Sequence, residues 1–171
     1  MAKLTTTILL ATALVTTAAC SKKRPEVLPP APGEAPSQPT GPTGPSGGAV
    51  TPGSSEDFKR SVTSDTVNFG LDVYDIDATA RGILDSQVVW LQRYPNVRVT
   101  IEGHADERGT REYNLALGDR RANSAKNYLV ARGVSPSRLT TISYGKERPL
   151  ALGSDESSWA QNRRAVTVVI N

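Results

Sequence analysis

Cysteine and histidine are nearly absent from this chain of 171 residues, which has one of each. A lone cysteine, Cys20, cannot form an internal disulfide, and a lone histidine, His104, excludes a metal site built from several histidines. The segment from Gly103 to Gly109 lacks the Gly-Lys-Ser/Thr ending of a phosphate-binding loop. We therefore expect no metal ion and no cofactor other than a covalent lipid, discussed below.

A strong excess of one charge is also missing. The formal net charge is +3, and much of it comes from four cations near the start of the chain: Lys3, Lys22, Lys23 and Arg24. From residue 56 onward, 16 lysines and arginines face 15 aspartates and glutamates. A nearly neutral folded part has no electrostatic footprint for a polyanion, so nucleic acid is not an expected partner.

Residues 1–19 have the three parts of a signal peptide. Lys3 supplies a single charge, an apolar run follows from Leu4 to Val15, and small residues lead up to Ala19. The run is shorter than the roughly 20 apolar residues of a membrane-spanning helix, and threonines interrupt it. We expect export and cleavage, and no permanent anchor from this run itself.

The single cysteine follows the expected cleavage point directly. Thr17-Ala18-Ala19-Cys20 resembles a bacterial lipobox, in which the thiol receives a diacylglycerol and the new amino terminus is acylated. Ordinary cleavage that leaves a free thiol is the alternative. Several acyl chains anchor durably, at about 0.8 kcal/mol per buried methylene group, so membrane attachment needs no transmembrane helix. Ser21, in place of aspartate, resembles lipoproteins that are sorted to the outer membrane.

Residues 20–55 are dominated by Pro, Gly, Ser, Thr and Ala, with pairs such as Pro29-Pro30 and Gly47-Gly48. Because so little apolar surface cannot offset the entropy of ordering, a disordered tether is expected after the acylated cysteine. Some 35 residues at about 3.1 Å each would extend on the order of 100 Å. Such a spacer suits a membrane anchor joined to a distant domain.

Residues 56–171 alternate strand-like and helix-like patterns and are predicted to form one domain. Helical spacing of apolar residues predicts long helices at 76–94 and 113–132, the second ended by Gly133, and a short helix at 157–162. Alternating or β-branched segments predict four strands, at 66–69, 97–101, 139–143 and 165–170. The expected fold class is α+β, a two-layer sandwich of a roughly four-stranded mixed sheet with two main helices.

A polar loop is expected at residues 102–110, between a strand and the second long helix. Loops at strand ends present functional groups, and flanking glycines would leave Asp106 free to point outward. Asn114 and Arg121 are seven residues apart and so share a helix face. Since a carboxylate binds ammonium and an arginine binds carboxylate, a zwitterionic ligand is the natural guest. Alternatively, Asp106 and Arg121 pair with each other or with neighbours.

These segments resemble the OmpA-like peptidoglycan-binding domain and, more narrowly, the peptidoglycan-associated lipoprotein (Pal) family. The resemblance covers residues 66–170 and the order of signal peptide, lipobox and tether, and it implies an OmpA-like fold of βαβαβ type. It is carried by an ordered set of motifs: Phe69-Gly70-Leu71-Asp72 with Tyr74-Asp75-Ile76, Glu102-Gly103-His104-Ala105-Asp106-Glu107-Arg108-Gly109-Thr110, Tyr113-Asn114, Arg120-Arg121-Ala122, Ser143-Tyr144-Gly145-Lys146-Glu147-Arg148-Pro149 and Asn162-Arg163-Arg164-Ala165-Val166.

In that family the ligand is the meso-diaminopimelate of the peptidoglycan stem peptide. The resemblance implies that Asp106 holds its side-chain ammonium group and Arg121 a carboxylate. It further implies a pocket lined by Leu71, Asp72, Asn114 and Leu117. The implied protein is an outer-membrane lipoprotein with its domain in the periplasm. TolB and other Tol-Pal components would be its partners, and it would act in envelope integrity and in outer-membrane constriction at cell division.

An enzyme that cleaves peptidoglycan is the rival hypothesis, with Glu102 and Asp106 or Glu107 as a carboxylate pair. Glycoside hydrolysis needs two carboxyl groups about 5 to 9.5 Å apart, one of them with a raised pKa. Arg108 and Arg111 nearby would lower carboxylate pKa values, so a non-enzymatic binding module is favoured.

Two further points stay open. A role as a docking protein for other envelope components is compatible with wall binding. The cluster Asn162-Arg163-Arg164 is either a basic patch for anionic partners, or one arginine shields a carboxylate near the site while the other is solvated.

Overall fold

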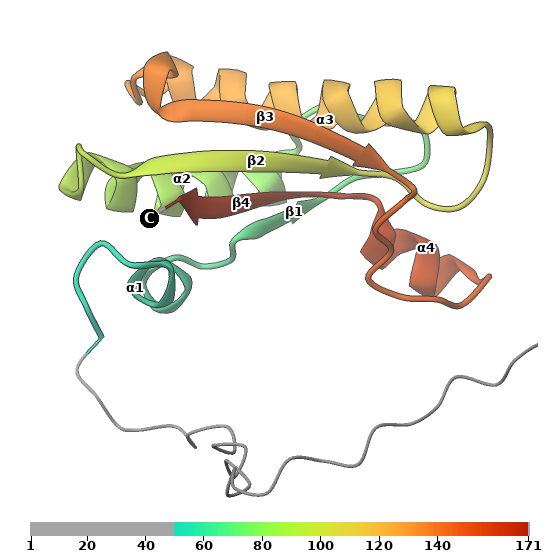
Figure 1. Cartoon of the computed structure of the whole chain (residues 1–171), viewed down its shortest axis with the longest axis horizontal. Helices are drawn as coiled ribbons and strands as arrows, with labels where there is room; N and C mark the ends of the chain where they lie inside the picture. Colours follow the sequence, from blue (N-terminus) through green and yellow to red (C-terminus); the bar gives the residue numbers. More distant parts are fainter. Residues whose placement is uncertain (1–49, 171) are drawn as a thin grey trace, which may run out of the picture. The chain divides into compact units, whose positions relative to one another are not determined.

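The computed structural model describes residues 50–170 (Figure 1). In chain order the elements are α1 (Ser55–Ser61), β1 (Thr66–Asn68), α2 (Ala78–Arg93), β2 (Arg98–His104), α3 (Arg111–Ala131), a 3₁₀ turn (Pro136–Arg138), β3 (Leu139–Gly145), α4 (Glu156–Asn162) and β4 (Arg164–Ile170). The strands form one sheet in the order β1-β4-β2-β3. β2 and β3 are parallel, whereas β4 is antiparallel to both β1 and β2. The predicted α+β class with a mixed four-stranded sheet is confirmed.

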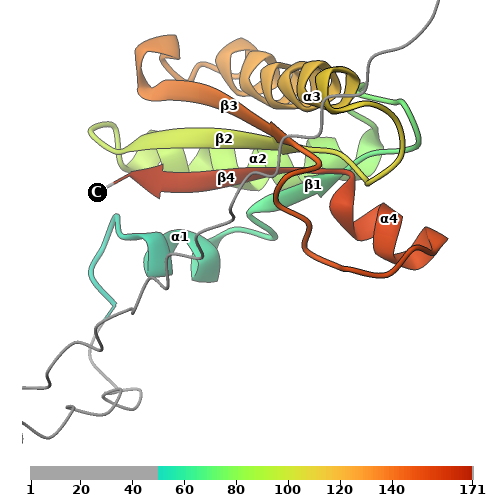
Figure 2. The same cartoon turned by 45° about the vertical axis from the view of Figure 1, so that its right-hand side comes forward.

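The two long helices cover one face of this sheet (Figures 1 and 2). α3 packs across β2, β3 and β4, and α2 packs against β1 and α3. Burial alternates along the strands, so that in β2 Val99 and Ile101 are buried while Arg98 is exposed. The predicted helix faces pack into this core: Leu84, Val88, Leu91, Leu117, Ala122, Ala125 and Leu129 are buried, and Ile83 is partly buried.

Local signals set the ends of both long helices. Asp77 caps α2 by accepting a hydrogen bond from the Ala80 amide at 2.7 Å. Thr110 caps α3 in the same way. Beyond α3 the chain turns at Gly133, whose φ of 93° lies in the left-handed region, and the Val134 amide donates to the Leu129 carbonyl. The predicted stop at Gly133 is confirmed.

β2 extends three residues beyond its predicted end. Glu102, Gly103 and His104 have little apolar character and suggested a loop, yet Glu102 and Gly103 pair with both β3 and β4. Gly103 is needed here for close approach and not for a turn, because a Cβ at this position would lie 1.8 Å from the carbonyl oxygen of Gly118. The two glycines bring α3 unusually close to β2.

The first helix, α1, was not predicted, and the expected domain boundary at residue 56 falls inside it. Seven residues are too few to show a helical period. Its formation depends on the Ser54 cap and on tertiary contacts: buried Phe58 packs edge-on against Trp90, and the Trp90 indole donates to Asp57 at 3.0 Å. Short elements of this kind are stabilised by packing more than by propensity.

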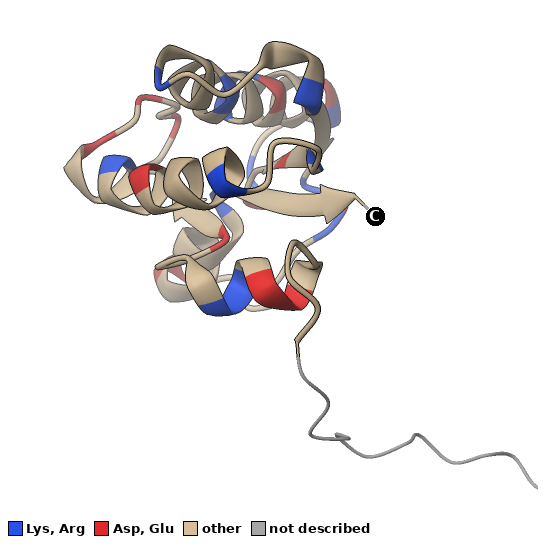
Figure 3. Ribbon diagram, turned by 90° about the vertical axis from the view of Figure 1, so that its left-hand side faces the viewer, with Lys and Arg blue, Asp and Glu red and all other residues tan. Residues whose placement is uncertain are grey.

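Within residues 50–170 no helix is long and apolar enough to cross a membrane. Lysines and arginines alternate with aspartates and glutamates over the helices that Figure 3 shows. The predicted signal peptide, the lipid-bearing Cys20 and nearly all of the predicted tether lie outside the described residues.

Candidate functional site

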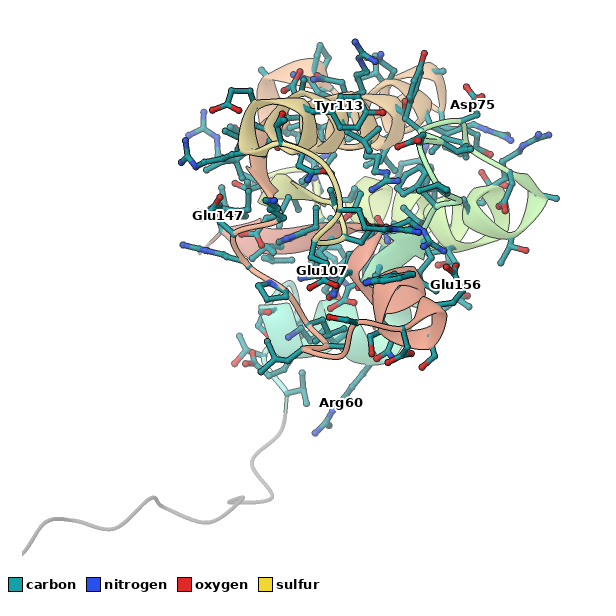
Figure 4. All side chains as sticks on the ribbon, turned by 90° about the vertical axis from the view of Figure 1, so that its right-hand side faces the viewer. Arg60, Asp75, Glu107, Tyr113, Glu147 and Glu156 are labelled. Atoms are coloured by element: carbon teal, nitrogen blue, oxygen red, sulfur yellow. The ribbon has the colours of Figure 1, made fainter. Side chains whose placement is uncertain are left out.

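A cavity of about 230 Å³ opens at the end of the sheet where β2 and β3 finish and α3 begins. Figure 4 faces this end, with Tyr113 at the top and Glu107 near the centre. The cavity is lined by Leu71, Asp72, Ala105, Asp106, Arg108, Gly109, Tyr113, Asn114, Leu117, Arg121 and Arg163. All six residues predicted to contact a peptidoglycan ligand are in this set. The structure therefore brings them together, while the binding itself stays a prediction.

The site loop, residues 105–110, is held rigidly by its own backbone groups. The Ala105 amide donates to the Gly145 carbonyl at 2.8 Å, which continues the pairing of β2 with β3. The Lys146 ammonium group donates to the carbonyls of Glu107 and Gly109, at 3.1 and 2.8 Å. Because these carbonyls are already satisfied, the loop does not need a ligand to hold its shape.

Asn114 completes this support from α3. Its side-chain amide donates to the Arg108 carbonyl at 2.7 Å, and the residue is buried. Gly109 between them has a φ of 85°, which only glycine adopts without strain. Asn114 lines the cavity as predicted, and in addition it positions the loop.

Asp106 does not point outward as predicted, since it is only 5% exposed. Oδ1 accepts from the backbone amide and the Nε of Arg108, both at 3.1 Å. Oδ2 accepts from Arg108 Nη2 at 2.5 Å and from Arg163 Nη1 at 3.5 Å. The alternative that Asp106 pairs with its neighbours therefore describes the unliganded site, but its partners are Arg108 and Arg163, not Arg121.

Opposing effects act on the pKa of the Asp106 carboxyl group. Burial raises it, but the hydrogen bonds and positive charge of Arg108, with a hydrogen bond from Arg163, outweigh burial and leave the pKa below its usual value. The carboxylate is therefore ionised at neutral pH and is a suitable partner for a cation.

Arg121 is fully buried at the back of the cavity. Its guanidinium donates from Nε to the Val73 carbonyl (2.9 Å), from Nη1 to the His104 carbonyl (2.8 Å) and from Nη2 to the Gly70 carbonyl (2.9 Å). A guanidinium has five N–H donors, so two remain after these three bonds. Among the described residues Arg121 forms no ion pair. Arg121 is thus a cation that is fixed in position and has two N–H groups left to donate.

The surroundings of Arg121 are electrostatically unfavourable for its charge. Burial first, and then the positive charge of Arg163, lower its pKa to about 10. It is still charged at neutral pH, and an anionic group entering the cavity would relieve this unfavourable environment.

The outer wall of the cavity is formed by the segment that joins β1 to α2. Asp72 adopts a left-handed conformation with a φ of 55°, unusual for a residue other than glycine and tolerated best by Asn and Asp. The Tyr113 hydroxyl donates to its carboxylate at 3.0 Å. Leu71 beside it is more than half exposed. Backbone strain of this kind is often found at binding sites.

Arg163 was not among the predicted site residues, although its cluster was singled out. It is buried and joins three parts of the site, donating to the Phe69 carbonyl (3.0 Å), to Asp106 and to Glu156 (2.6 Å). One arginine of the cluster therefore does shield a site carboxylate. The other, Arg164, is not solvated as expected: it is buried and donates to the Arg148 and Asn162 carbonyls.

His104 and Trp159 lie around the site without lining it. His104 is buried, and neither ring nitrogen has a hydrogen-bond partner in the described part of the chain. Trp159 in α4 donates from its indole to Glu107 at 3.0 Å, and the Arg108 guanidinium stacks 4.1 Å from its ring centroid. α4 is thereby attached to the site loop.

The carboxylates near the loop are poorly suited to acid catalysis. Hydrogen bonds from Ser154 and Trp159 lower the pKa of Glu107, and that of Asp106 is lowered as well. Neither Glu102 nor Glu107 lines the cavity. Nor do residues 50–170 contain a group of three or more His, Cys, Asp or Glu side chains placed to hold a metal ion.

Known proteins with a similar sequence and fold are described as peptidoglycan-associated lipoproteins. The chain is 59% identical to a peptidoglycan-associated lipoprotein of Rhizobium meliloti (strain 1021) over 122 residues, which are 71% of this chain and 69% of that protein. The crystal structure of the peptidoglycan-associated lipoprotein from Burkholderia pseudomallei superposes with a TM-score of 0.61 and 42% identity, covering 63% of this chain and 91% of the other.

More distant structures share the fold alone. The C-terminal domain of Helicobacter pylori MotB has a TM-score of 0.59 at 21% identity, covering 63% of this chain and 84% of that one. Neither these descriptions nor the names of the relatives indicate an enzyme. Residues 68–163, which are more than half of the chain and include every residue that lines the cavity, match the sequence model of the OmpA family. The chain therefore belongs to the OmpA family.

Proposed function

We propose that this protein binds peptidoglycan non-covalently through the diaminopimelate of the stem peptide and so ties the outer membrane to the cell wall. The observation that carries the proposal is Arg121, a buried cation that has two spare N–H donors and no ion-pair partner among the described residues. A ligand carboxylate would form the direct ion pair that Arg121 does not make with any described residue, and it would accept a hydrogen bond from each spare N–H group.

The cavity that contains Arg121 also carries negative charge. Asp106 and Asp72 both line it, so a ligand with an ammonium group beside its carboxylate meets complementary charges at both ends. The free end of diaminopimelate carries both groups on one carbon atom. A volume of about 230 Å³ is sufficient for a small amino-acid group and too small for a folded partner.

The names of the relatives support the choice of polymer. Proteins up to 59% identical to this chain are called peptidoglycan-associated lipoproteins. For a lipoprotein the lipid would be carried by Cys20, and the segment up to residue 55 would span the distance to the wall. We place the protein in the outer membrane by its lipid, with the folded domain in the periplasm.

The partners follow from the same resemblance. We propose that TolB and other Tol-Pal components bind this protein, and that it acts in envelope integrity and in outer-membrane constriction at cell division. The protein would be a binder with no enzymatic activity of its own, because the lowered pKa values of Asp106 and Glu107 do not suit a general acid.

Sedimentation with insoluble peptidoglycan tests the proposal. The full chain in mild detergent is expected to pellet with the wall, and Asp106→Asn and Arg121→Gln to stay in solution. Each change leaves a ligand charge unpaired, at a cost of about 2 kcal/mol or roughly 30-fold in affinity.

Arg120→Gln is the matched control, since it removes one positive charge from the next position of α3, where the side chain is exposed over Tyr74. It should pellet like the wild type. Thermal unfolding of each variant identifies any loss that comes from misfolding. If folded Asp106→Asn and Arg120→Gln pellet equally well, the cavity is not the wall-binding site.

A further inference from the structure

The position that the proposed function assigns to a ligand ammonium group is already occupied. An ionised carboxylate offers about four acceptor positions. In Asp106 the amide and side chain of Arg108 take three of them and Arg163 takes the fourth. A ligand ammonium group can therefore reach Asp106 only if one of these guanidinium groups gives way.

The two arginines differ in how firmly they are held. The Arg163 side chain is 7% exposed and is fixed by hydrogen bonds to the Phe69 carbonyl and to Glu156, besides Asp106. The Arg108 side chain is 34% exposed, and apart from Asp106 it contacts the face of the Trp159 ring. Arg108 is the one that can leave, because rotation of its side chain breaks no buried backbone contact and brings the charge into water.

The Trp159 ring gives Arg108 a defined resting place. The ring is itself held by the indole bond to Glu107, next to Arg108 in the site loop. The guanidinium thus lies between the indole face and the carboxylate, with cation–π attraction on one side and a two-point ion pair on the other. Displacing it costs both interactions, while the Arg108 backbone amide remains on Asp106.

We propose that Arg108 competes with the ligand's ammonium group for Asp106 and so sets a minimum of further contacts that a ligand needs in order to bind. This inference rests on the proposed function. A simple cation would exchange one ion pair at Asp106 for another and gain little. A ligand that also offers a carboxylate to Arg121 gains a second charge-assisted contact, which offsets the displacement of Arg108. Arg108 lowers the affinity of every ligand that has to displace it by the same factor, so only a ligand with the second contact at Arg121 keeps enough affinity to bind.

Arg108→Met tests this role, because methionine fills similar space without the charge. The full chain in detergent is titrated with free meso-diaminopimelate and with Nα-acetyl-L-lysine amide, whose blocked α-carbon leaves the side-chain ammonium as its only charge. We expect the variant to bind both ligands about tenfold more tightly than the wild type, because neither ligand then has to displace Arg108 from Asp106.

Arg111→Met is the matched control. Arg111 carries the same charge three residues away, pairs with Glu147 at 3.1 Å, is exposed and does not line the cavity. Its substitution should leave both affinities and their ratio unchanged, which separates displacement of Arg108 from a general effect of net charge.

Trp159 provides a second readout. In a Trp90→Phe background it is the only tryptophan, and it does not line the cavity, so its fluorescence reports the stacked Arg108. Ligand should change this fluorescence in the parent and leave it unchanged in Arg108→Met, although the variant still binds.

The outcomes separate this inference from the function on which it rests. If the wild type binds diaminopimelate and folded Arg108→Met binds it equally or more weakly, Arg108 is not a competitor and only this inference fails. If the wild type binds no diaminopimelate, while thermal unfolding shows that it is folded, the proposed function and the inference fail together.

Discussion

The charged residues of the cavity are stabilised in two different ways. Among the described residues Arg121 has no direct ion pair and is held by three backbone carbonyls, with Asp106 and Asp72 attracting its charge from a distance, whereas Asp106 is surrounded by two guanidinium groups. A buried cation whose direct hydrogen-bond partners are all neutral carbonyls retains a preference for an anion. At the level of single residues, we therefore expect the cavity to select for a carboxylate first and for an ammonium group second.

His104 gives the fold a predictable response to acid. Burial first, and then the positive charges of Arg164 and Arg148, lower its pKa from 6.5 to about 4. Between these values the unfolded chain binds a proton that the folded chain does not, so stability falls as pH falls from about 6.5 towards 4. The expected loss between pH 7 and pH 5 is on the order of 2 kcal/mol, measured by urea unfolding.

The control for this prediction is His104→Phe, which keeps a ring beside Tyr144 without titrating. Because His104 is the only histidine, the variant should lose most of the pH dependence in this window. Asp57, Asp106, Glu107 and Asp155 have lowered pKa values, so their stabilisation is lost only below about pH 4.5. An unchanged slope in His104→Phe would assign the acid response to another group.

The sequence predicted which residues meet at the cavity better than it predicted their partners. Asp106, Asn114 and Arg121 were placed on a strand end and a helix face, and both placements depend only on local periodicity. The contact of Asp106 with Arg163, 57 positions away, was predicted only as one of two alternatives for the arginine cluster and without its partner, because no local pattern encodes such a contact. Short motifs indicate which residues gather, and tertiary contacts decide which of them pair.

Among the elements, α3 is the one whose position determines the site, because Asn114, Leu117 and Arg121 all project from it into the cavity. Its distance from the sheet is set by Gly118, which lies against Gly103 of β2. A side chain at either glycine would separate the helix from the strand that carries the site loop.

Gly118→Ala is therefore expected to destabilise the fold and to weaken wall binding. The added Cβ would lie 2.4 Å from Ser143 Oγ and 2.8 Å from the Gly103 carbonyl oxygen, and the backbone atom cannot move freely. Overpacking of this kind costs about 2 kcal/mol or more, which a urea unfolding curve would measure.

Gly82→Ala is the matched substitution in α2. No atom lies within 4 Å of its added Cβ, so only helix propensity changes and a gain of about 0.5 to 1 kcal/mol is expected. If the two substitutions shift the unfolding midpoint alike, close approach of α3 to β2 is not what Gly118 provides.

Elements with a clear period were predicted within about two residues, as α2 and α3 show. Two kinds of element were not. α1 is too short to show a period and depends on Trp90, more than thirty positions away. The end of β2 has a polar and glycine-containing sequence but is held by strands on both sides. In both cases contacts distant in sequence override the local pattern.

At the scale of the whole molecule, three tasks would be divided along the chain. Cys20 would supply attachment, the residues that follow would supply reach, and the cavity would supply recognition. The folded part carries nearly balanced charge, so its attraction to the wall has to come from the cavity and not from a general electrostatic field. Binding to the wall would therefore depend on recognition of one small chemical group in a large polymer.

The most direct test uses the unaltered full chain and two walls. Peptidoglycan with meso-diaminopimelate in its stem is compared with peptidoglycan that has L-lysine at the same position, which lacks the second carboxylate. The protein is predicted to sediment with the diaminopimelate wall and to stay in solution with the lysine wall, and free meso-diaminopimelate should release it. Equal sedimentation with both walls would contradict a clamp formed by Asp106 and Arg121.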